Sequence, residues 1–218
     1  MTILALDTSS AAVTVAVHDG STVRAASVEY GATAHGELLA PVIARVLAAA
    51  GITAVGLSRI IVGVGPGPFT GLRIGIVTAR VMGDALGIPV SGVCSLDAIA
   101  AQAVFDHAVT AEFAVATDAR RKEVYLATYG VDGRRRSGPV VLRPDAVDPV
   151  ARSAQVVGAG AALYPEYFDD RREPLLVSAE WLVRVALDQP EFVVDPIPLY
   201  LRRPDAVANV SRKRVTPS

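Results

Sequence analysis

One stretch decides the fold: Ile60-Ile61-Val62-Gly63-Val64-Gly65-Pro66-Gly67-Pro68-Phe69-Thr70-Gly71. Its β-branched start predicts a buried strand over Arg59 to Val64. Apolar residues at helical spacing then predict a helix over Leu72 to Leu86, ended by Gly87 and Pro89. A strand that passes through a short loop into a helix is a unit of layered α/β proteins, so we expect that class.

Three strands and a helix are predicted before this stretch. Apolar runs predict a buried strand over Thr2 to Leu6 and a second strand over Val13 to Val17, where valines alternate with smaller residues. An Asp-Gly hairpin signal follows, and Thr22 to Tyr30 reads as a third strand. A broad apolar stripe predicts a helix over Leu38 to Ala50.

The second half repeats this order more faintly. We expect strands over Glu112 to Thr117, Glu123 to Val131, Pro139 to Leu142 and Gln155 to Val157, and helices over Ser95 to Phe105 (capped by Ser95), Asp145 to Arg152 and Ser178 to Asp188. Two copies of βββαβα predict a duplicated α/β architecture with two lobes, residues 1–108 and 109–218.

Composition excludes several classes of protein. The 218 residues are 51% hydrophobic and carry a net charge of −1, which excludes nucleic-acid binding by bulk charge alone. A single cysteine, Cys94, excludes an internal disulfide and fits a reducing compartment. Prolines and glycines interrupt the most apolar window, and no signal peptide is evident, so we expect a cytoplasmic protein without a membrane contact.

Two segments could bind a nucleotide. The carboxylate and hydroxyls of Asp7-Thr8-Ser9 could face phosphates and Mg²⁺, or could satisfy the backbone of a turn. Gly65, Gly67 and Gly71 could let the backbone approach an anion at a helix N-terminus, or could form a rigid connector. The loop has neither the lysine nor the spacing of a Walker loop, and the local chemistry leaves both interpretations open.

Other polar candidates give weaker indications. His35 has Leu39 four residues later, so the second ligand of a helical metal site is missing and a capping or interface role is favoured. Asp118-Ala119-Arg120-Arg121 could grip a phosphate or a carboxylate, or could be a solvated turn with an ion pair. The tail from Leu201 could contact RNA phosphates or could simply be solvated. Its basic residues are Arg202, Arg203, Arg212, Lys213 and Arg214, against Asp205.

Five segments together resemble the TsaB (YeaZ) family. They are Ile3 to Ser9, His35 to Pro41, Val64 to Gly75, Asp118 to Tyr125 and Pro198 to Arg202, and they occur in the family's order. The resemblance implies the actin/hexokinase/Hsp70-like (ASKHA) fold. It also implies a role in forming threonylcarbamoyladenosine (t6A) beside the anticodon of tRNA.

The resemblance further implies a set of partners. A protein of this family is the non-catalytic partner of a TsaD-type transferase, with which it forms a heterodimer, and it forms a homodimer when alone. A TsaE-type ATPase completes the complex, a TsaC-type enzyme makes the threonylcarbamoyl donor, and tRNA is reached through the complex. The subunit itself requires no cofactor, although ATP or ADP could bind at the complex interface.

The implied site residues follow from the same resemblance. The family pairs through its two N-terminal helices, and no catalytic or metal-binding residue is implied for this chain. The implied interface comprises His35, Leu38, Leu39, Val42, Val46, Arg73, Ile76, Val77 and Arg80. The implied nucleotide site is degenerate and comprises Asp7, Thr8, Ser9, Gly65, Gly67 and Gly71, with Gly158-Ala159-Gly160 as a trace of adenosine-binding glycines.

Two enzymatic hypotheses compete with this interpretation. An ATP-dependent small-molecule kinase of the ASKHA superfamily would use Asp7-Thr8-Ser9 and the glycine loop, and it requires ATP binding by the isolated protein. A metallopeptidase would require a set of metal ligands that the sequence does not provide.

Overall fold

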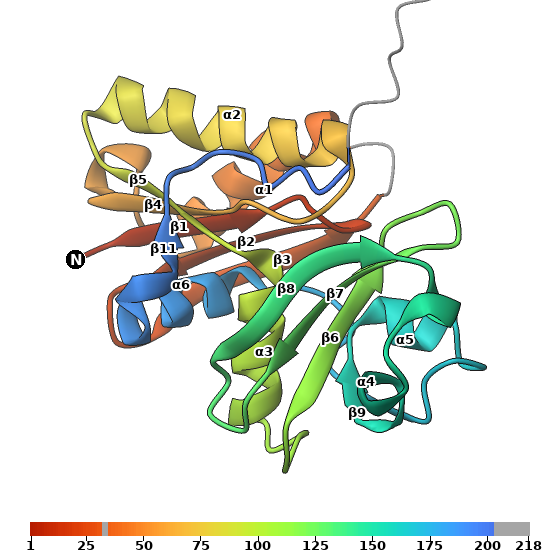
Figure 1. Ribbon diagram of the computed structural model, residues 1–218. Coiled ribbons are helices and arrows are strands. Elements are labelled where there is room, and N and C mark those ends of the chain that lie inside the picture. Colours follow the sequence, from red (N-terminus) through yellow and green to blue (C-terminus); the bar gives the residue numbers. More distant parts are fainter. Residues whose placement is uncertain (32–34, 203–218) are drawn as a thin grey trace, which may run out of the picture.

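The first sheet of the computed structural model holds six strands in the order β11-β5-β4-β1-β2-β3 (Figure 1). The structure describes residues 1–31 and 35–202. Strands β1, β2 and β3 form an antiparallel meander, whereas β4 is parallel to β1 and β5 is parallel to β4. The strands of this sheet are β1 (Ile3–Asp7), β2 (Ala12–His18), β3 (Val23–Tyr30), β4 (Arg59–Gly63), β5 (Val90–Val93) and β11 (Val193–Val194).

Two long helices cover one face of this sheet. They are α1 (His35–Ala49) and α2 (Phe69–Leu86), and their apolar stripes pack on the buried side chains of β1, β2 and β4 (Figure 1). A 3₁₀ turn, η1 (Ala54–Gly56), lies in the connection from α1 to β4. Helix α2 ends at Gly87, whose φ of +66° gives the left-handed cap that the sequence predicts.

The second sheet holds five strands in the order β10-β9-β6-β7-β8. Its strands are β6 (Phe113–Asp118), β7 (Val124–Tyr129), β8 (Arg135–Leu142), β9 (Gln155–Val157) and β10 (Asp170–Arg172). The helices that follow β5 in the chain are α3 (Ser95–Phe105), η2 (Pro144–Ala146), α4 (Pro149–Ser153), α5 (Ala159–Leu163), α6 (Ala179–Asp188) and η3 (Pro190–Phe192). Strands β10 and β11, strand β5 and helix α5 were not predicted from the sequence.

The two halves have the same topology. The first runs β1-β2-β3-α1-β4-α2-β5-α3, and the second runs β6-β7-β8-α4-β9-α5-β10-α6. In each half the first three strands pair antiparallel, and the fourth and fifth pair parallel beside the first. The predicted duplication of βββαβα is therefore confirmed, although the halves share no visible sequence repeat.

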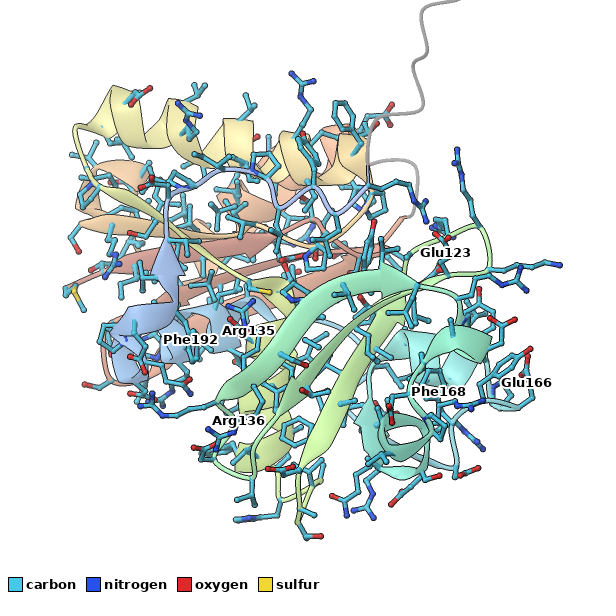
Figure 2. All side chains as sticks on the ribbon, in the orientation of Figure 1. Glu123, Arg135, Arg136, Glu166, Phe168 and Phe192 are labelled. Atoms are coloured by element: carbon cyan, nitrogen blue, oxygen red, sulfur yellow. The ribbon has the colours of Figure 1, made fainter. Side chains whose placement is uncertain are left out.

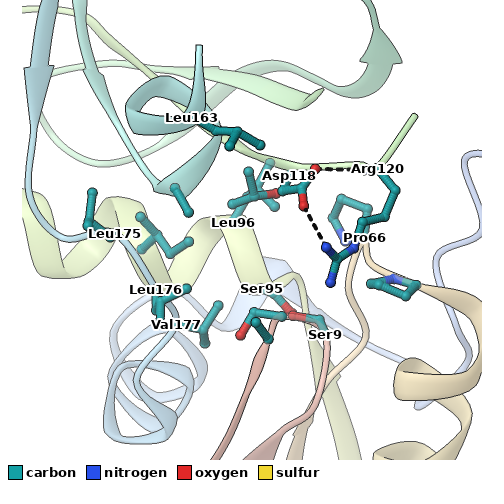
Figure 3. Close-up of a pocket in the computed structure, with 16 residues that line it drawn as sticks. Ser9, Pro66, Ser95, Leu96, Asp118, Arg120, Leu163, Leu175, Leu176 and Val177 are labelled. Atoms are coloured by element: carbon teal, nitrogen blue, oxygen red, sulfur yellow. Dashed lines mark hydrogen bonds and ion pairs between the residues drawn. The ribbon is translucent and has the colours of Figure 1, made fainter. Parts of the chain in front are cut away.

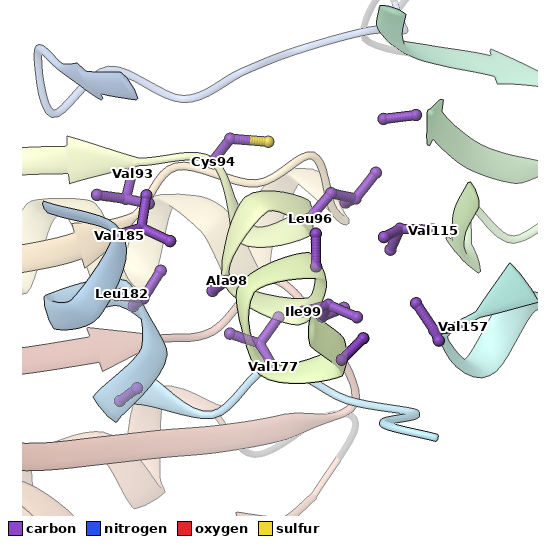
Figure 4. Close-up of a cluster of buried hydrophobic side chains, with 14 of the residues drawn as sticks. Val93, Cys94, Leu96, Ala98, Ile99, Val115, Val157, Val177, Leu182 and Val185 are labelled. Carbon is purple, nitrogen blue, oxygen red and sulfur yellow. The ribbon is translucent and has the colours of Figure 1, made fainter. Parts of the chain in front are cut away.

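Helices α3 and α6 each pack on the sheet of the other half of the chain. Helix α3 packs on β6 and β9 of the second sheet, α6 packs on β1, β2 and β4 of the first, and the two helices pack on each other. Their buried side chains form one core that joins the sheets, in which Leu96 and Ile99 lie near Val115 while Leu182 lies near Val93 (Figure 4). The expectation that residues 109–218 form one lobe is corrected here, because α6 and β11 return to the first sheet.

The parallel strands place their carboxyl ends along a cleft between the sheets. Strand β1 ends at Asp7 beside the end of β4, and β6 continues to Asp118 beyond the end of β9, whose last residue Val157 pairs with Val115. Ligands of open α/β sheets bind at such edges. The candidate site therefore begins with the residues that follow these strands.

Candidate functional site

The carboxylate of Asp7 is fully buried and is held by two serines. Its Oδ1 accepts hydrogen bonds from the Ser9 backbone N–H (2.7 Å) and the Ser9 hydroxyl (2.6 Å), and its Oδ2 accepts one from the Ser95 hydroxyl (2.5 Å). Burial raises the pKa of Asp7 above its ordinary value, and these hydrogen bonds oppose that rise. In this structure the carboxylate therefore holds Ser9 and Ser95 in place.

Thr8 fastens the same corner to helix α2. Its hydroxyl donates to the Gly71 carbonyl (2.7 Å) and accepts from the Gly75 backbone N–H (3.1 Å). Both glycines face Thr8 directly: a Cβ on Gly71 would lie 2.5 Å from the Thr8 carbonyl oxygen, and one on Gly75 would lie 2.4 Å from the Thr8 hydroxyl. The hydroxyl therefore satisfies backbone groups, which is the simpler of the two interpretations of this turn.

The glycines of the loop before α2 face the protein itself. A Cβ on Gly67 would lie 2.3 Å from the Ser9 carbonyl oxygen, and one on Gly65 would lie 2.7 Å from the Leu72 side chain. Gly65 also has a φ of +91°, which favours glycine. These glycines allow the chain to pack closely on itself, and phosphate binding by them stays a prediction.

Gly158 and Gly160 also allow the chain to pack closely on itself. A Cβ on Gly158 would lie 2.3 Å from the Ala116 carbonyl oxygen, and one on Gly160 would lie 2.9 Å from the same carbonyl group. The sharp turn between β9 and α5 therefore rests directly on β6. This packing explains the two glycines without an adenosine.

A cavity of about 210 Å³ lies between the two sheets (Figure 3). Leu163 and Leu175 form one side and are 53% and 36% exposed, while Ser9 and Ser95 lie on the other. The remaining lining residues are mainly apolar or small and are Ser10, Ala11, Pro66, Pro68, Leu96, Ile99, Thr117, Asp118, Arg120, Ala159, Leu176 and Val177. Asp118 and Arg120 form an ion pair at the rim (3.4 Å), as the solvated-turn interpretation predicted.

His35 lies at a second hollow, of about 310 Å³, beside the start of α2. The imidazole is 7% exposed, and its Nε2 lies 2.9 Å from the Ser10 carbonyl oxygen. This contact ties the start of α1 to the β1–β2 corner. In the described residues, 1–31 and 35–202, no group of three or more His, Cys, Asp or Glu side chains could hold a metal ion.

Only some of the residues predicted for the partner interface are exposed. Leu39, Val42, Val46 and Ile76 are at most 2% exposed because they pack on the first sheet, and His35 is nearly as buried, so their assignment to an interface is corrected. Sequence periodicity alone did not separate the inner face of these helices from the outer one. The predicted residues that do reach the surface are Leu38, which is half-buried, and Arg73, Val77 and Arg80, which are exposed.

Part of the predicted tail also has a defined place. Arg202 forms an ion pair with Glu123, and its Nη1 donates to the Ala119 carbonyl (3.3 Å). The other basic residues of the tail, Arg203, Arg212, Lys213 and Arg214, lie outside the described residues. Within the described part of the chain, no helix is long and apolar enough to cross a membrane.

Comparison with known proteins identifies the family. Residues 29–164 match the family model described as "TsaD: tRNA N6-adenosine threonylcarbamoyltransferase". An Escherichia coli protein named tRNA threonylcarbamoyladenosine biosynthesis protein TsaB is 32% identical over 76% of this chain and 74% of its own. The solved structure of YeaZ from Pseudomonas aeruginosa matches 92% of this chain and 99% of its own, with a TM-score of 0.75 and 33% identity. The chain belongs to the TsaB (YeaZ) family.

Uncharacterized mycobacterial proteins are more similar to this chain in sequence. One from Mycobacterium tuberculosis is 45% identical over 94% of this chain and 93% of its own. One from Mycobacterium leprae is 44% identical over 94% of this chain, which spans only 55% of that longer protein. The YeaZ match and the duplicated topology together confirm the predicted fold class.

Sequence reasoning missed three features of this TsaB family member. Ser95 was assigned to helix capping, but it makes no cap and binds Asp7 and the Gly65 N–H instead. The Tyr125 hydroxyl donates to the Gly67 carbonyl (3.4 Å) from the second sheet. Val81, which is 60% exposed on the outer face of α2, extends the row begun by Val77 at i+4 spacing and could have been found from that spacing.

Proposed function

We propose that the protein is a non-catalytic cytoplasmic partner of a TsaD-type threonylcarbamoyltransferase in the formation of t6A in tRNA. The Escherichia coli and Bacillus subtilis relatives are named as t6A biosynthesis proteins. The match of residues 29–164 to the TsaD family model supports a common fold for the two partners.

The burial of Asp7 carries the non-catalytic part of the proposal. A carboxylate that ligates Mg²⁺ must expose an oxygen, but Asp7 is 0% exposed and accepts three hydrogen bonds from Ser9 and Ser95. The helical position four residues after His35 holds the buried Leu39. The kinase and metallopeptidase hypotheses therefore gain no support from these side chains.

The outer faces of α1 and α2 form the proposed docking surface for the TsaD-type partner. Val77 and Val81 are 53% and 60% exposed, and Arg80 lies beside them. The exposed side chains of α1 include Ala40 and Ala44, which are small enough for close approach by another helix. Exposed apolar side chains with arginines at their edge are typical of the centre and rim of a protein interface.

The same surface is proposed to mediate a homodimer when the protein is alone. Self-association and binding of the TsaD-type partner would then compete. A TsaE-type ATPase would join the heterodimer, a TsaC-type enzyme would supply the threonylcarbamoyl donor, and the complex interface would be the place for ATP or ADP.

Light scattering on a sizing column tests the proposal. The protein is run alone and mixed with the TsaD-type protein of the same cell, and a homodimer that exchanges for a one-to-one heterodimer is expected. The variant Val77→Arg/Val81→Arg is expected to remain folded by circular dichroism and to lose the heterodimer. The matched control, Val55→Arg/Val150→Arg, changes valines that are 84% and 81% exposed elsewhere and is expected to keep it.

Two outcomes would contradict the proposal in different ways. A heterodimer of normal stability with Val77→Arg/Val81→Arg would refute the docking surface and leave the partnership intact. No complex between the wild-type proteins, with or without nucleotide, would refute the partnership itself.

A further inference from the structure

The turn between β6 and β7 holds three consecutive basic residues in a strained conformation. Arg120, Arg121 and Lys122 have φ values of +59°, +56° and +60°, and all three are exposed. The left-handed region disfavours residues with a Cβ and is usual for glycine or asparagine. Such strain at consecutive exposed positions favours a functional role for the side chains over a purely structural one.

This turn lies against the start of α2. Arg120 lines the 310 Å³ hollow together with Thr70 and Ile74 of that helix. Arg202 reaches the turn from the other side, through Glu123 and the Ala119 carbonyl, and Figure 2 places Glu123 at this edge of the molecule. The turn, the start of α2 and the segment ending at Arg202 therefore form one continuous surface.

A three-layer stack of side chains borders the turn. The rings of Phe69 and Tyr200 are stacked with centroids 5.0 Å apart at 23°, and the Arg73 guanidinium lies 5.0 Å from the Phe69 centroid. The two aromatic residues are 43% and 41% exposed, which is high for rings of their size. An exposed ring can stack with a planar ligand.

The charge of this basic–aromatic surface differs from that of the whole chain. We define the surface by Phe69, Arg73, Arg120, Arg121, Lys122, Tyr200 and Arg202. Five of its seven members are cationic, and among the described residues Asp118 pairs with Arg120 and Glu123 pairs with Arg202, whereas the whole chain carries a net charge of −1. Exposed aromatic rings beside a local excess of positive charge are typical of proteins that bind unpaired nucleotides.

We propose that the basic–aromatic surface binds a single-stranded loop of RNA, with phosphates at Arg121 and Lys122 and a base stacked on Tyr200. The inference rests on the proposed function, in which tRNA is the substrate of the complex, and it adds a direct contact by this subunit. An acidic protein surface is the competing occupant, but it would leave the exposed aromatic pair unexplained.

The test measures binding of a fluorescein-labelled anticodon stem-loop RNA to the complex with the TsaD-type protein. Arg121→Gln/Lys122→Gln is expected to lower affinity about tenfold, and to reduce the slope of log affinity against log salt by about 0.7 for each cation removed. The control Arg24→Gln/Arg136→Gln removes two exposed arginines outside this surface and is expected to bind as the wild type does. Tyr200→Ala is expected to lower the affinity for the RNA about tenfold, and Tyr200→Phe is expected to bind it as the wild type does.

Each other outcome overturns the inference. Wild-type affinity and salt slope in Arg121→Gln/Lys122→Gln, with an RNA-binding complex, would refute this surface while the proposed function stands. Loss of the heterodimer together with RNA binding in that variant would assign the turn to a protein contact instead. Failure of the wild-type complex to bind the RNA would refute both the surface and the role of the complex in tRNA modification.

Discussion

The hydroxyl of Ser95 donates to Oδ2 of Asp7 across 2.5 Å, and the two residues are 88 positions apart in the chain. The same hydroxyl accepts the Gly65 backbone N–H at 3.1 Å. Three segments that converge on the cleft (the end of β1, the glycine–proline loop and the start of α3) are thus joined through one buried carboxylate. The residue that first suggested a nucleotide site is a structural junction in this conformation.

The buried carboxylate predicts an unusual pH dependence. Burial raises the pKa of Asp7 above 3.8, so the folded protein binds this proton more tightly than the unfolded chain does. The stability contributed by Asp7 is therefore complete below pH 3.8 and is lost as the pH rises through the folded pKa. We expect the free energy of unfolding of the wild type, relative to Asp7→Asn, to fall over that range in urea titrations at several pH values.

Asp19 is a control whose pKa shift, and therefore whose effect of pH on stability, is opposite in sign to that of Asp7. Hydrogen bonds from the backbone of Thr22 and Ser21 lower its pKa from 3.8 to about 2. Its contribution is present above pH 3.8 and is lost as the pH falls toward 2, so the wild type relative to Asp19→Asn should gain stability as the pH rises. Equal slopes of stability against pH for the two variants would contradict the raised pKa of Asp7.

The close packing of Gly75 predicts that alanine at this position destabilises the protein, whereas alanine at Gly36 does not. A Cβ on Gly75 would lie 2.4 Å from the Thr8 hydroxyl, which is itself fixed by Gly71 and by the Gly75 N–H. Among the described residues, a Cβ on Gly36 would instead make an ordinary contact with Ile74 at 3.8 Å. Gly75→Ala should lower the free energy of unfolding by about 1–3 kcal/mol through overpacking. Gly36→Ala should be neutral or raise it by up to about 1 kcal/mol. Denaturant titration distinguishes them, and equal effects would refute the packing role of Gly75.

The elements that sequence predicts well are those with long apolar patterns. Helix α2 and strand β2 were anticipated within a few residues, because burial on one or both sides imposes a clear periodicity. Strand β5 was missed because its four residues include a glycine, and β10 because its residues, Asp170–Arg172, are all charged. Such short strands are specified by the neighbours they pair with rather than by their own sequence.

The candidate site was harder to predict for a related reason. The β1–β2 corner was recognised, but its role depends on Ser95, and no local pattern connects residues so far apart. On the helices, Val42 and Val77 have the same chemistry, yet one is 1% and the other 53% exposed. Only the packing of α1 and α2 on the sheet decides which valine a partner could touch.

The buried ion pair between Asp97 and Arg135 predicts a large loss of stability when its cation is removed. Asp97 is 3% exposed, accepts a hydrogen bond from the Tyr129 hydroxyl (2.8 Å) and lies 3.4 Å from Nε of Arg135, which also packs on Phe192 (Figure 2). Arg135→Met would leave the carboxylate buried without its cation and should cost about 3–5 kcal/mol of unfolding free energy. Urea titration measures the loss.

Two further variants make that prediction specific. Asp97→Asn/Arg135→Met removes both charges and should recover part of the stability, because no uncompensated charge remains. Arg136→Met changes an exposed arginine that pairs with Asp132 and should stay within about 0.5 kcal/mol of the wild type. A loss for Arg136→Met equal to that for Arg135→Met would contradict a role for the buried pair.

Cys94 reports on the opening of the same core. Its thiol is 4% exposed, and burial raises its pKa from 9.0 to about 12, so the native thiolate is scarce at neutral pH. We expect negligible reaction with a thiol-specific disulfide reagent in the native protein and full reaction in urea. Because Cys94 immediately precedes α3, which joins the two sheets, slow native labelling measures how often that junction opens. Arg135→Met should accelerate the labelling and Arg136→Met should not, whereas rapid labelling of the wild type would show that the shared core is open.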